Sequence, residues 1–459
     1  MVMEEVFDKF ISDSETKSFD IAHRETIAYN ISKYDIAVKK GKTQYSNLEL
    51  ARRRAANIKH RSVSNLEDQL KEFEQVISSR GVKVLWALDD NDARLSIIDI
   101  LEKHYVKLVV KSKSMVTEEI GLVECLEKNG IEAIETDLGE YIVQISNDKP
   151  YHIVTPVMHR SAKDIAKIFN EKFGLPLESS PRRITSFVRE NLREKFLKAS
   201  AGITGANFIV ADTGAIALTE NEGNGVMSTS FPNVHIVIAG IEKVIPSLND
   251  LNLFWPLLST HGTGQKVTAY NSIFTGPRKP DENSGPDHMY VILLDNGRSE
   301  LLKQIPQRRA LSCIRCGACL NGCPVYRNIG GHSYGTVYSG PIGAVISPHF
   351  KGLPEYKHLS YASSLCGKCT EVCPVAIDLH TQLLNNRKLT VKNKLTGRAE
   401  KTGMNFWKIV MKRRWLLNLP SPAVKNYAIN TLFKNSWGKR RVMPKVSKKT
   451  FGTLWKEME

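Results

Sequence analysis

Apolar residues follow two different periods along this chain. Between residues 82 and 300, short apolar runs such as VKVLWAL (82–88), KLVVKS (107–112) and VHIVIAG (234–240) alternate with amphipathic stretches. Apolar runs of four to eight residues are typical of buried strands, and apolar positions three or four apart are typical of helices. The alternation predicts an α/β domain with a largely parallel sheet.

Start and stop signals place the elements more closely. We expect Asp89 or Asp90 to cap a helix, Ser161 to cap another, and Pro181 to begin a helix over 181–200. The stretch TEEIGLVECLEKNG predicts a helix that ends at Gly130 and buries Cys125 as a core thiol. Further strands are expected in these segments: IEAIETD, YHIVTPV (151–157), 206–220 (two strands around a turn), KVTAYNSIFTG and MYVILLDNG.

The composition is that of an ordinary globular protein. The 459 residues predict two or three domains, and 42% hydrophobic with 24% charged residues exclude a disordered or fibrous chain. No apolar run approaches the roughly 18 residues that span a bilayer. The first ten residues, MVMEEVFDKF, do not form a secretory signal, so we expect a cytoplasmic protein.

The net charge of +16 is concentrated at one end of the chain. Residues 387–459 hold 19 Lys and Arg against 3 Asp and Glu, whereas the first 386 residues are neutral. The same segment carries four of the six tryptophans, namely Trp407, Trp415, Trp437 and Trp455. Basic residues among aromatics suit an acidic partner, the inner face of a membrane or a nucleic-acid backbone, or form a solvated face whose tryptophans pack on the chain itself. No nucleic-acid motif accompanies the charge.

Seven of the eight cysteines form two short runs. CIRCGACLNGCP (313–324) is C-x2-C-x2-C-x3-C-P, the bacterial ferredoxin run. CGKCTEVCP (366–374) is the same run without its first cysteine, and Ser363 stands at that position. Glycines within the runs keep side chains clear of a cluster, so that backbone N–H groups can face its sulfur atoms.

In two-cluster ferredoxins, the fourth cysteine of each run ligates the other cluster. Applied here, the rule assigns Cys313, Cys316, Cys319 and Cys373 to cluster one, a [4Fe–4S] site. It assigns Cys323, Cys366 and Cys369 to cluster two. With three thiolates, cluster two is either [3Fe–4S] or a [4Fe–4S] whose fourth position is open or filled by another ligand such as Ser363.

Other interpretations of the cysteines fit less well. Zinc usually takes two C-x2-C pairs, and seven cysteines in this order do not divide that way. The odd count and the expected cytoplasmic setting disfavour disulfides.

Several smaller motifs point to sites with less force. Gly331–Gly335 matches G-x-S-x-G, but it lacks the strand and helix that a nucleophile elbow needs, which favours a glycine-rich turn. GNG (223–225) and GTG (262–264) are glycine pairs able to face an anion, and neither is a full phosphate-binding motif. Weaker candidates follow from their nearness to these glycines or to strand ends: Asp212, Thr213, Glu220, Glu222, His235 and His261.

The stretches 211–251 and 262–278, followed by the two cysteine runs, resemble the iron–sulfur B proteins of bacterial L-lactate utilisation. The resemblance covers nearly the full length. It implies a LUD domain, related to the sugar-phosphate isomerase and CoA-transferase α/β fold, and then an all-α dicluster ferredoxin-type domain. It also implies electron transfer during oxidation of L-lactate to pyruvate, together with a cysteine-rich subunit and a smaller LUD protein. It does not show where lactate binds.

Together these observations predict four regions. They are an N-terminal helical region (1–80), the LUD domain (81–300), the two-cluster domain (301–386) and a basic C-terminal region (387–459). The favoured function is an electron-transfer subunit. The alternatives are a LUD domain that itself binds and oxidises lactate or a related 2-hydroxy acid, and a regulatory protein that senses through a labile cluster.

Overall fold

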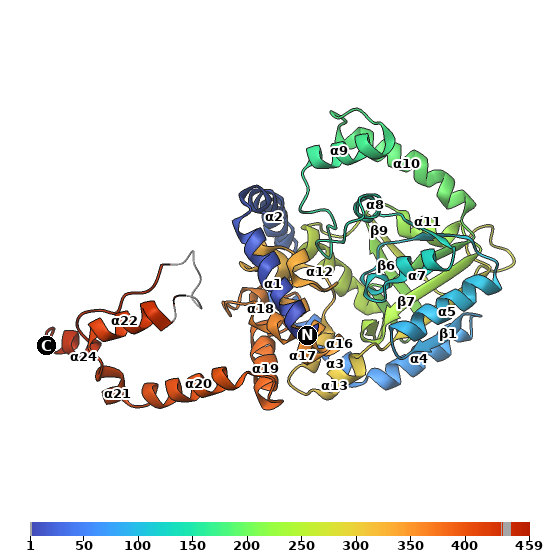
Figure 1. Cartoon of the computed structure of the whole chain (residues 1–459). Helices are drawn as coiled ribbons and strands as arrows, with labels where there is room; N and C mark the ends of the chain where they lie inside the picture. Colours follow the sequence, from blue (N-terminus) through green and yellow to red (C-terminus); the bar gives the residue numbers. More distant parts are fainter. Residues whose placement is uncertain (1, 433, 435–441) are drawn as a thin grey trace. The chain divides into compact units, whose positions relative to one another are not determined.

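The computed structural model describes residues 2–432, 434 and 442–459 (Figure 1). Contacts divide the chain into two compact units, Met1–Leu389 and Thr390–Glu459, and each is described by itself. The region boundaries expected at residues 80 and 300 fall inside the first unit and stay predictions.

A six-stranded, fully parallel sheet lies at the centre of the first unit, in the order β1-β10-β7-β4-β2-β3. Its strands are Lys83–Ala87 (β1), Leu108–Lys111 (β2), Glu132–Glu135 (β3), Ala201–Thr204 (β4), Val234–Gly240 (β7) and His288–Leu294 (β10). The inner strands are almost wholly apolar because both faces of the sheet are covered. The predicted parallel sheet is therefore confirmed.

A second sheet, which the sequence did not predict, lies against one face of the first. Its order is β8-β5-β6-β9, and its strands are Phe208–Val210 (β5), Ala215–Glu220 (β6), Val244–Ile245 (β8) and Tyr270–Phe274 (β9). Strands β5 and β6 form the hairpin expected over 206–220. Ile209, Ile216 and Val244 pack with Val237 and Val291 of the parallel sheet.

Helices close both sides of these sheets. Alternate residues of β7 and β10, such as Ile238 and Ile292, pack on helices α5, α6 and α7. The opposite face takes α4 and the second sheet. The helices of the sheet region are α5 (Asp90–Lys103), α6 (Met115–Glu119), α7 (Leu122–Lys128), α8 (Leu138–Ile145), α9 (Ala162–Phe173), α10 (Pro181–Lys198), α11 (Asn224–Ser230) and α12 (Leu251–Thr263). Asp89 and Ser161 cap α5 and α9 as expected.

The N-terminal helices share one core with the cysteine-bearing segments. Ile27, Ile31 and Val63 belong to the same buried cluster as Leu311 and Tyr326. Helix α3 also reaches the second cysteine run, where the Arg52 guanidinium donates to the Cys373 carbonyl at 2.8 and 3.0 Å. The N-terminal helices are α1 (Val2–Phe19), α2 (Ile21–Gly41), α3 (Leu48–Ser64) and α4 (Leu66–Ser78).

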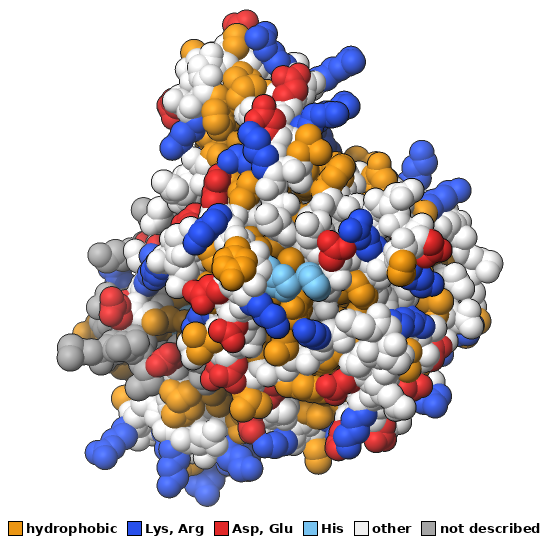
Figure 2. Space-filling model, turned by 90° about the vertical axis from the view of Figure 1, so that its right-hand side faces the viewer, with side chains coloured by type: hydrophobic (Ala, Val, Ile, Leu, Met, Phe, Trp, Pro, Cys, Tyr) orange, Lys and Arg blue, Asp and Glu red, His pale blue; other side chains and the backbone are white. Residues whose placement is uncertain are grey.

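Short helices surround the cysteines, as expected for a helical two-cluster domain. They are α13 (Arg298–Lys303), α14 (Ala318–Gly322), α15 (Tyr326–Ile329), α16 (Gly340–Phe350), α17 (Leu353–Tyr356), α18 (Lys368–Glu371) and α19 (Leu379–Lys392). On the face drawn in Figure 2, basic and acidic side chains are interspersed, which fits the charge balance of the first 386 residues.

Three local predictions were wrong. Residues 151–157 form turns instead of a strand, because their N–H groups bond within the loop: Tyr151 to the Pro156 carbonyl, and Val154 and Thr155 to the His152 ring. The helix expected to end at Gly130 breaks into α6 and α7 at Gly121, whose φ is +60°. Cys125 is half-buried rather than a core thiol.

The described residues of the second unit include helices α20 (Arg398–Met411), α21 (Arg414–Asn418), α22 (Pro422–Leu432) and α24 (Phe451–Lys456). From residue 391 onward, no described residue is buried. The expected tryptophan set is exposed at Trp407, Trp415 and Trp455, whereas Trp437 lies outside the described residues.

A buried ion network joins the parallel sheet to the cysteine-bearing half. Arg298 in α13 donates to Glu242, after β7, at 2.5 Å and to Glu119 in α6 at 2.8 and 2.9 Å. Tyr338 donates to the same Glu119 carboxylate at 2.6 Å. Burial raises the pKa of Glu119, but the bonds from Arg298 outweigh it and hold that pKa below its usual value. Burial also raises the pKa of Glu242, but Arg298 and Arg315 outweigh it and lower that pKa to about 2, so both carboxylates stay charged at neutral pH.

We expect Arg298→Met to lower the free energy of unfolding by about 3–5 kcal/mol, because it leaves two buried carboxylates without their cation. Anaerobic urea unfolding measures this change. Lys71→Met, which breaks an exposed pair with Glu67, is the control and should leave the midpoint unchanged. Equal stability of the two variants would contradict the role of the network.

Candidate iron–sulfur site

The two cysteine runs have the same local backbone, offset by 50 residues. The residue before the second cysteine of the pattern is left-handed in both, with φ of 60° at Arg315 and 56° at Leu365. The residue after it is a left-handed glycine in both, with φ of 77° at Gly317 and 79° at Gly367. A short helix, α14 or α18, begins directly after each glycine. The pseudo-repeat seen in the sequence is therefore also a structural one.

The structure brings the predicted cluster-one cysteines together. Burial raises the pKa of Cys316, and the neighbouring Cys373 and Cys313 thiols raise it further. Burial also raises the pKa of Cys319, with contributions from the other three. Cys316, Cys319 and Cys373 are buried and Cys313 is half-buried. These four thiols lie within electrostatic range of one another inside the protein.

The remaining three cysteines form a separate group nearer the surface. Burial raises the pKa of Cys369 to about 11, with contributions from Cys323 and Cys366. Cys323 and Cys369 are buried, whereas Cys366 is exposed. One predicted centre is therefore internal and the other reaches solvent.

The spacing of the sulfur atoms does not suit a single metal ion. Zn–S bonds of about 2.3 Å hold four sulfurs about 3.8 Å apart around zinc. Within the described part of the chain, which includes all seven cysteines of the runs, no group of three or more ligand atoms within 4.8 Å of one another contains a cysteine. A multi-iron cluster separates its thiolates more widely, because each binds a different iron.

Backbone N–H groups point at three of the sulfur atoms. These bonds run from Arg315 to Cys313 at 3.4 Å, from Tyr326 to Cys323 at 3.5 Å and from Ile377 to Cys373 at 3.4 Å. Such N–H groups stabilise negative charge on a cluster and its thiolates. Together with the thiol grouping, they show that the residues present fit iron–sulfur clusters.

Ser363 occupies the position in the second run that Cys313 occupies in the first. The Leu365 N–H donates to the Ser363 hydroxyl oxygen at 3.1 Å, as the Arg315 N–H donates to the Cys313 sulfur at 3.4 Å. The serine oxygen therefore has the same relation to its loop N–H as the Cys313 sulfur has.

Buried cations near Cys313 were missed by the sequence analysis, since nothing local distinguishes them from surface lysines. Lys59 donates to the carbonyls of Glu242 and Val244 at 2.6 and 3.0 Å, and burial lowers its pKa to about 7. Lys243 and Arg315 are also buried within electrostatic range of Cys313. The positive charges here offset the negative charge of a thiolate-bound cluster.

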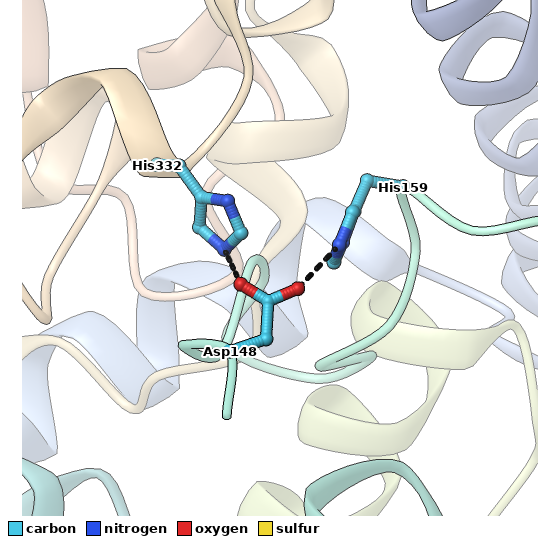
Figure 3. Close-up of side chains that lie close together, drawn as sticks. All are labelled: Asp148, His159 and His332. Carbon is cyan, nitrogen blue, oxygen red and sulfur yellow. Dashed lines mark hydrogen bonds and ion pairs between the residues drawn. The ribbon is translucent and has the colours of Figure 1, made fainter. Parts of the chain in front are cut away.

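Asp148, His159 and His332 form a polar cluster that joins the loop before α9 to the turn before α16 (Figure 3). The Asp148 carboxylate pairs with His159 Nε2 at 3.1 Å and with Arg160 at 2.6 Å, and lies 3.8 Å from His332 Nε2. His332 Nε2 also lies 2.7 Å from the Lys149 carbonyl, so this nitrogen carries a proton.

This cluster has the residue types of a metal site, but its hydrogen bonds are those of a structural contact that holds two loops together. A protonated ring nitrogen cannot ligate a metal, and the Arg160 cation already neutralises the carboxylate. Burial raises the pKa of Asp148, but the bonds from His159, the Lys149 N–H and Arg160 outweigh it and hold that pKa well below its usual value. Close packing holds the same two loops together, because Gly330 and Gly331, just before His332, lie so near Tyr151 that a Cβ at either would come within 1.8 Å of it.

The smaller glycine motifs have structural explanations. The N–H groups of Gly225 and Val226, which begin α11, are taken by the Glu220 carboxylate at 2.7 and 2.8 Å. Gly264 ends α12 with φ of 79° and packs on the Ala37 backbone. Ser333 is buried and donates to the Ile329 carbonyl at 2.7 Å, which is a turn contact. These contacts occupy the glycine motifs locally, and Gly225 and Gly262 also line a cavity.

Most of the other weak candidates also make structural hydrogen bonds, and two of them line a cavity. His235 Nε2 lies 2.8 Å from the Thr204 hydroxyl, and His261 Nδ1 lies 2.9 Å from the Leu257 carbonyl. Asp212 accepts the Leu248 N–H and the Thr213 carbonyl accepts from Arg80. Glu222, which accepts the Leu138 N–H at 3.0 Å, lines a cavity with Glu220.

Comparison with family models now gives the class of protein. Residues 70–294 match the LUD domain, and residues 309–377 match the 4Fe-4S dicluster domain. The chain is therefore a LUD-domain protein with iron–sulfur clusters held in its second half.

Curated relatives give the particular family. Lactate utilization protein B of Oceanobacillus iheyensis is 40% identical over 431 residues, covering 90% of this chain and 89% of the relative. Lactate utilization protein B 2 of Bacillus mycoides and the protein B of Bacillus cereus are each 44% identical over 371 residues, covering 80% of this chain and 78% of each relative. The chain belongs to the lactate utilization protein B family.

A DUF162 family protein from Deinococcus radiodurans, whose crystal structure is solved, is 12% identical with a TM-score of 0.29. It covers 50% of this chain and 98% of its own, and at this score it supports no argument about the fold.

Asp148→Asn should lower the free energy of unfolding by about 1–2 kcal/mol at pH 7, allowing for the partial exposure of the site. Because the folded pKa of Asp148 is depressed, its stabilisation is complete above the unfolded value of about 4 and is lost only as the pH falls toward the folded value. Urea unfolding of the two proteins should therefore show the same difference from pH 8 to pH 5. A difference that disappears in this range would contradict the stabilising role of the Asp148 contacts.

Proposed function

We propose that this protein transfers electrons, one at a time, through two iron–sulfur clusters during oxidation of L-lactate to pyruvate. The observation that carries the proposal is the division of seven cysteines into an internal group of four and a group of three that reaches the surface. Relatives named for lactate utilisation support the substrate. The LUD domain acting alone as a lactate oxidase is not favoured.

In this proposal, Cys313, Cys316, Cys319 and Cys373 hold cluster one as [4Fe–4S], and Cys323, Cys366 and Cys369 hold cluster two. Burial raises the pKa of the Cys373 thiol to about 11, so it is neutral at pH 7 until iron displaces its proton.

Once bound, the clusters would supply one-electron redox chemistry, and the residues around them would set their charge environment and exposure. N–H donors, the buried cations Lys243 and Arg315 and, when protonated, the buried Lys59 would stabilise negative charge at cluster one. Cys366 brings cluster two to the surface, where a partner can approach it. The two cysteine groups would thus hold one redox centre within reach of a partner and one inside the protein.

For cluster two, we propose a [4Fe–4S] cluster whose fourth ligand is the Ser363 oxygen. The support is the shared backbone of the two runs and the matching N–H bonds to Ser363 and Cys313. The alternative is a [3Fe–4S] cluster with this position open.

The partners proposed are a cysteine-rich subunit and a smaller LUD protein. We place the assembly in the cytoplasm, where the basic C-terminal unit contacts the inner face of the membrane. No described helix is long and apolar enough to cross a bilayer. Exposed Phe406, Trp407 and Trp415, next to Lys412, Arg413 and Arg414, support interfacial binding to anionic lipid.

Two substitutions test the cluster assignment. Cys369→Ser should perturb cluster two and spare cluster one, and Ser363→Ala should convert cluster two to [3Fe–4S] with the loss of about one iron per chain. EPR of anaerobically purified protein, with iron and sulfide counts, measures both.

Ser363→Cys is the matched control and should keep four irons in cluster two. Folded Cys369→Ser protein without either cluster would contradict the ligand sets, and unchanged iron in Ser363→Ala would contradict the serine ligand. A colourless native sample that holds zinc would contradict the function itself.

Membrane contact predicts that the full chain co-sediments with vesicles containing anionic lipid and not with neutral ones. Reversal of Lys412, Arg413 and Arg414 to Glu should abolish this binding at physiological salt. Unchanged co-sedimentation of the reversed protein would exclude the membrane role of this segment.

A further inference from the structure

A cavity of about 520 Å³ lies between the parallel sheet and cluster one, and the proposed function leaves it unused. Its floor is formed by residues that follow the carboxyl ends of β2, β3, β4 and β7, and Cys316 belongs to its wall. The volume is within the range of small-molecule sites, about 300–1,000 Å³.

The cavity lies where open α/β sheets bind ligands. From β2 the chain moves outward to β3, and then returns to the other side of β2 to form β4. The loops after β2 and β4 diverge at this reversal, and both line the cavity, through Ser112–Ser114 and Gly205–Asn207. A crevice at the carboxyl ends of strands, at the point of reversal, is the general ligand position in such sheets.

Three cations line the cavity; Lys113 donates to the Val154 carbonyl at 2.5 Å, and the other two, Lys243 and Arg315, have unused donors. Lys243 is 7% exposed and, among the described residues, has no hydrogen-bond or ion-pair partner. Arg315 pairs with Glu242 through Nη2 at 3.3 Å, but its buried Nη1 has no partner. Burial, together with the adjacent Arg315, lowers the pKa of Lys243 to about 8. Two neighbouring buried cations with vacant donors are the arrangement that an anion stabilises.

Carboxylates on the same cavity limit the charge of that anion. Asp137, Glu220 and Glu222 line it, and burial followed by the nearby Asp137 raises the pKa of Glu222 to about 7. Phosphate esters and dicarboxylates would be repelled by this wall. A ligand with one carboxylate and a hydroxyl or keto oxygen satisfies both sets of residues, since a hydroxyl can donate to a carboxylate and a protonated Glu222 can donate to a keto oxygen.

We propose that this cavity binds a small hydroxy or oxo monocarboxylic acid, with its carboxylate on Lys243 and Arg315 beside cluster one. The proposal deepens the proposed function and rests on it for the presence of cluster one; it concerns binding, without oxidation in the cavity. A carboxylate next to the cluster disfavours an added electron, so binding and reduction oppose each other. By linkage, reduction of cluster one weakens binding by the same factor by which binding disfavours reduction. Substrate or product concentration thereby regulates electron transfer.

Anaerobic calorimetry on the cluster-loaded full chain tests the site, with L-lactate and pyruvate as separate probes. At least one probe should bind saturably, and Lys243→Met should weaken it about tenfold or more, as expected for loss of a charged hydrogen bond. The control is Lys42→Met, because Lys42 is also within electrostatic range of Cys316 but does not line the cavity. It should leave the affinity unchanged.

In the native protein, a saturating probe should also move the reduction potential of cluster one to more negative values, as followed by EPR titration. Failure of both probes to bind, an unchanged potential, or full affinity in Lys243→Met would each overturn the proposal. Full affinity with an altered potential in Lys243→Met would assign the lysine to charge compensation of the cluster alone. Iron and sulfide counts on the same samples test the proposed function separately.

Discussion

The structure depends on a chain of buried charges that runs from the parallel sheet into the first cysteine run. Glu119 and Glu242 leave the sheet region, Arg298 bridges them, and Arg315 carries the network into the loop between Cys313 and Cys316. Such a network contributes little net stability compared with apolar packing, yet breaking it leaves uncompensated buried charge. It therefore fixes the register between sheet and cysteine loop more than it adds to their attraction.

Much of the secondary structure and the cysteine pattern was predictable from local sequence. Apolar runs marked the parallel strands, Asp89 and Ser161 marked helix starts, and the cysteine spacing indicated iron–sulfur clusters. Each of these signals acts over a few residues, where spacing and capping chemistry decide the result. The ligand sets assigned from that spacing remain predictions.

Features that depend on distant partners were not predictable. Residues 151–157 have the composition of a strand, but Pro156 and the His152 ring take up their backbone donors. Lys59 and Lys243 look like surface lysines in the sequence, and only the fold shows that both are buried beside Cys313. Glu220 was a weak candidate only because it lies near glycines at a strand end, and its capping of the adjacent helix through its carboxylate depends on the fold.

The bond between Arg52 and the Cys373 carbonyl has a consequence for synthesis of the chain. Helix α3 leaves the ribosome early, and the residue it holds emerges 321 positions later. The apolar faces of the N-terminal helices share a core with segments between residues 151 and 258 and with segments beyond residue 310, so their native covering is incomplete until the cysteine runs have been made. A chain that ends before the cysteine runs would therefore expose part of these apolar faces and be prone to aggregation.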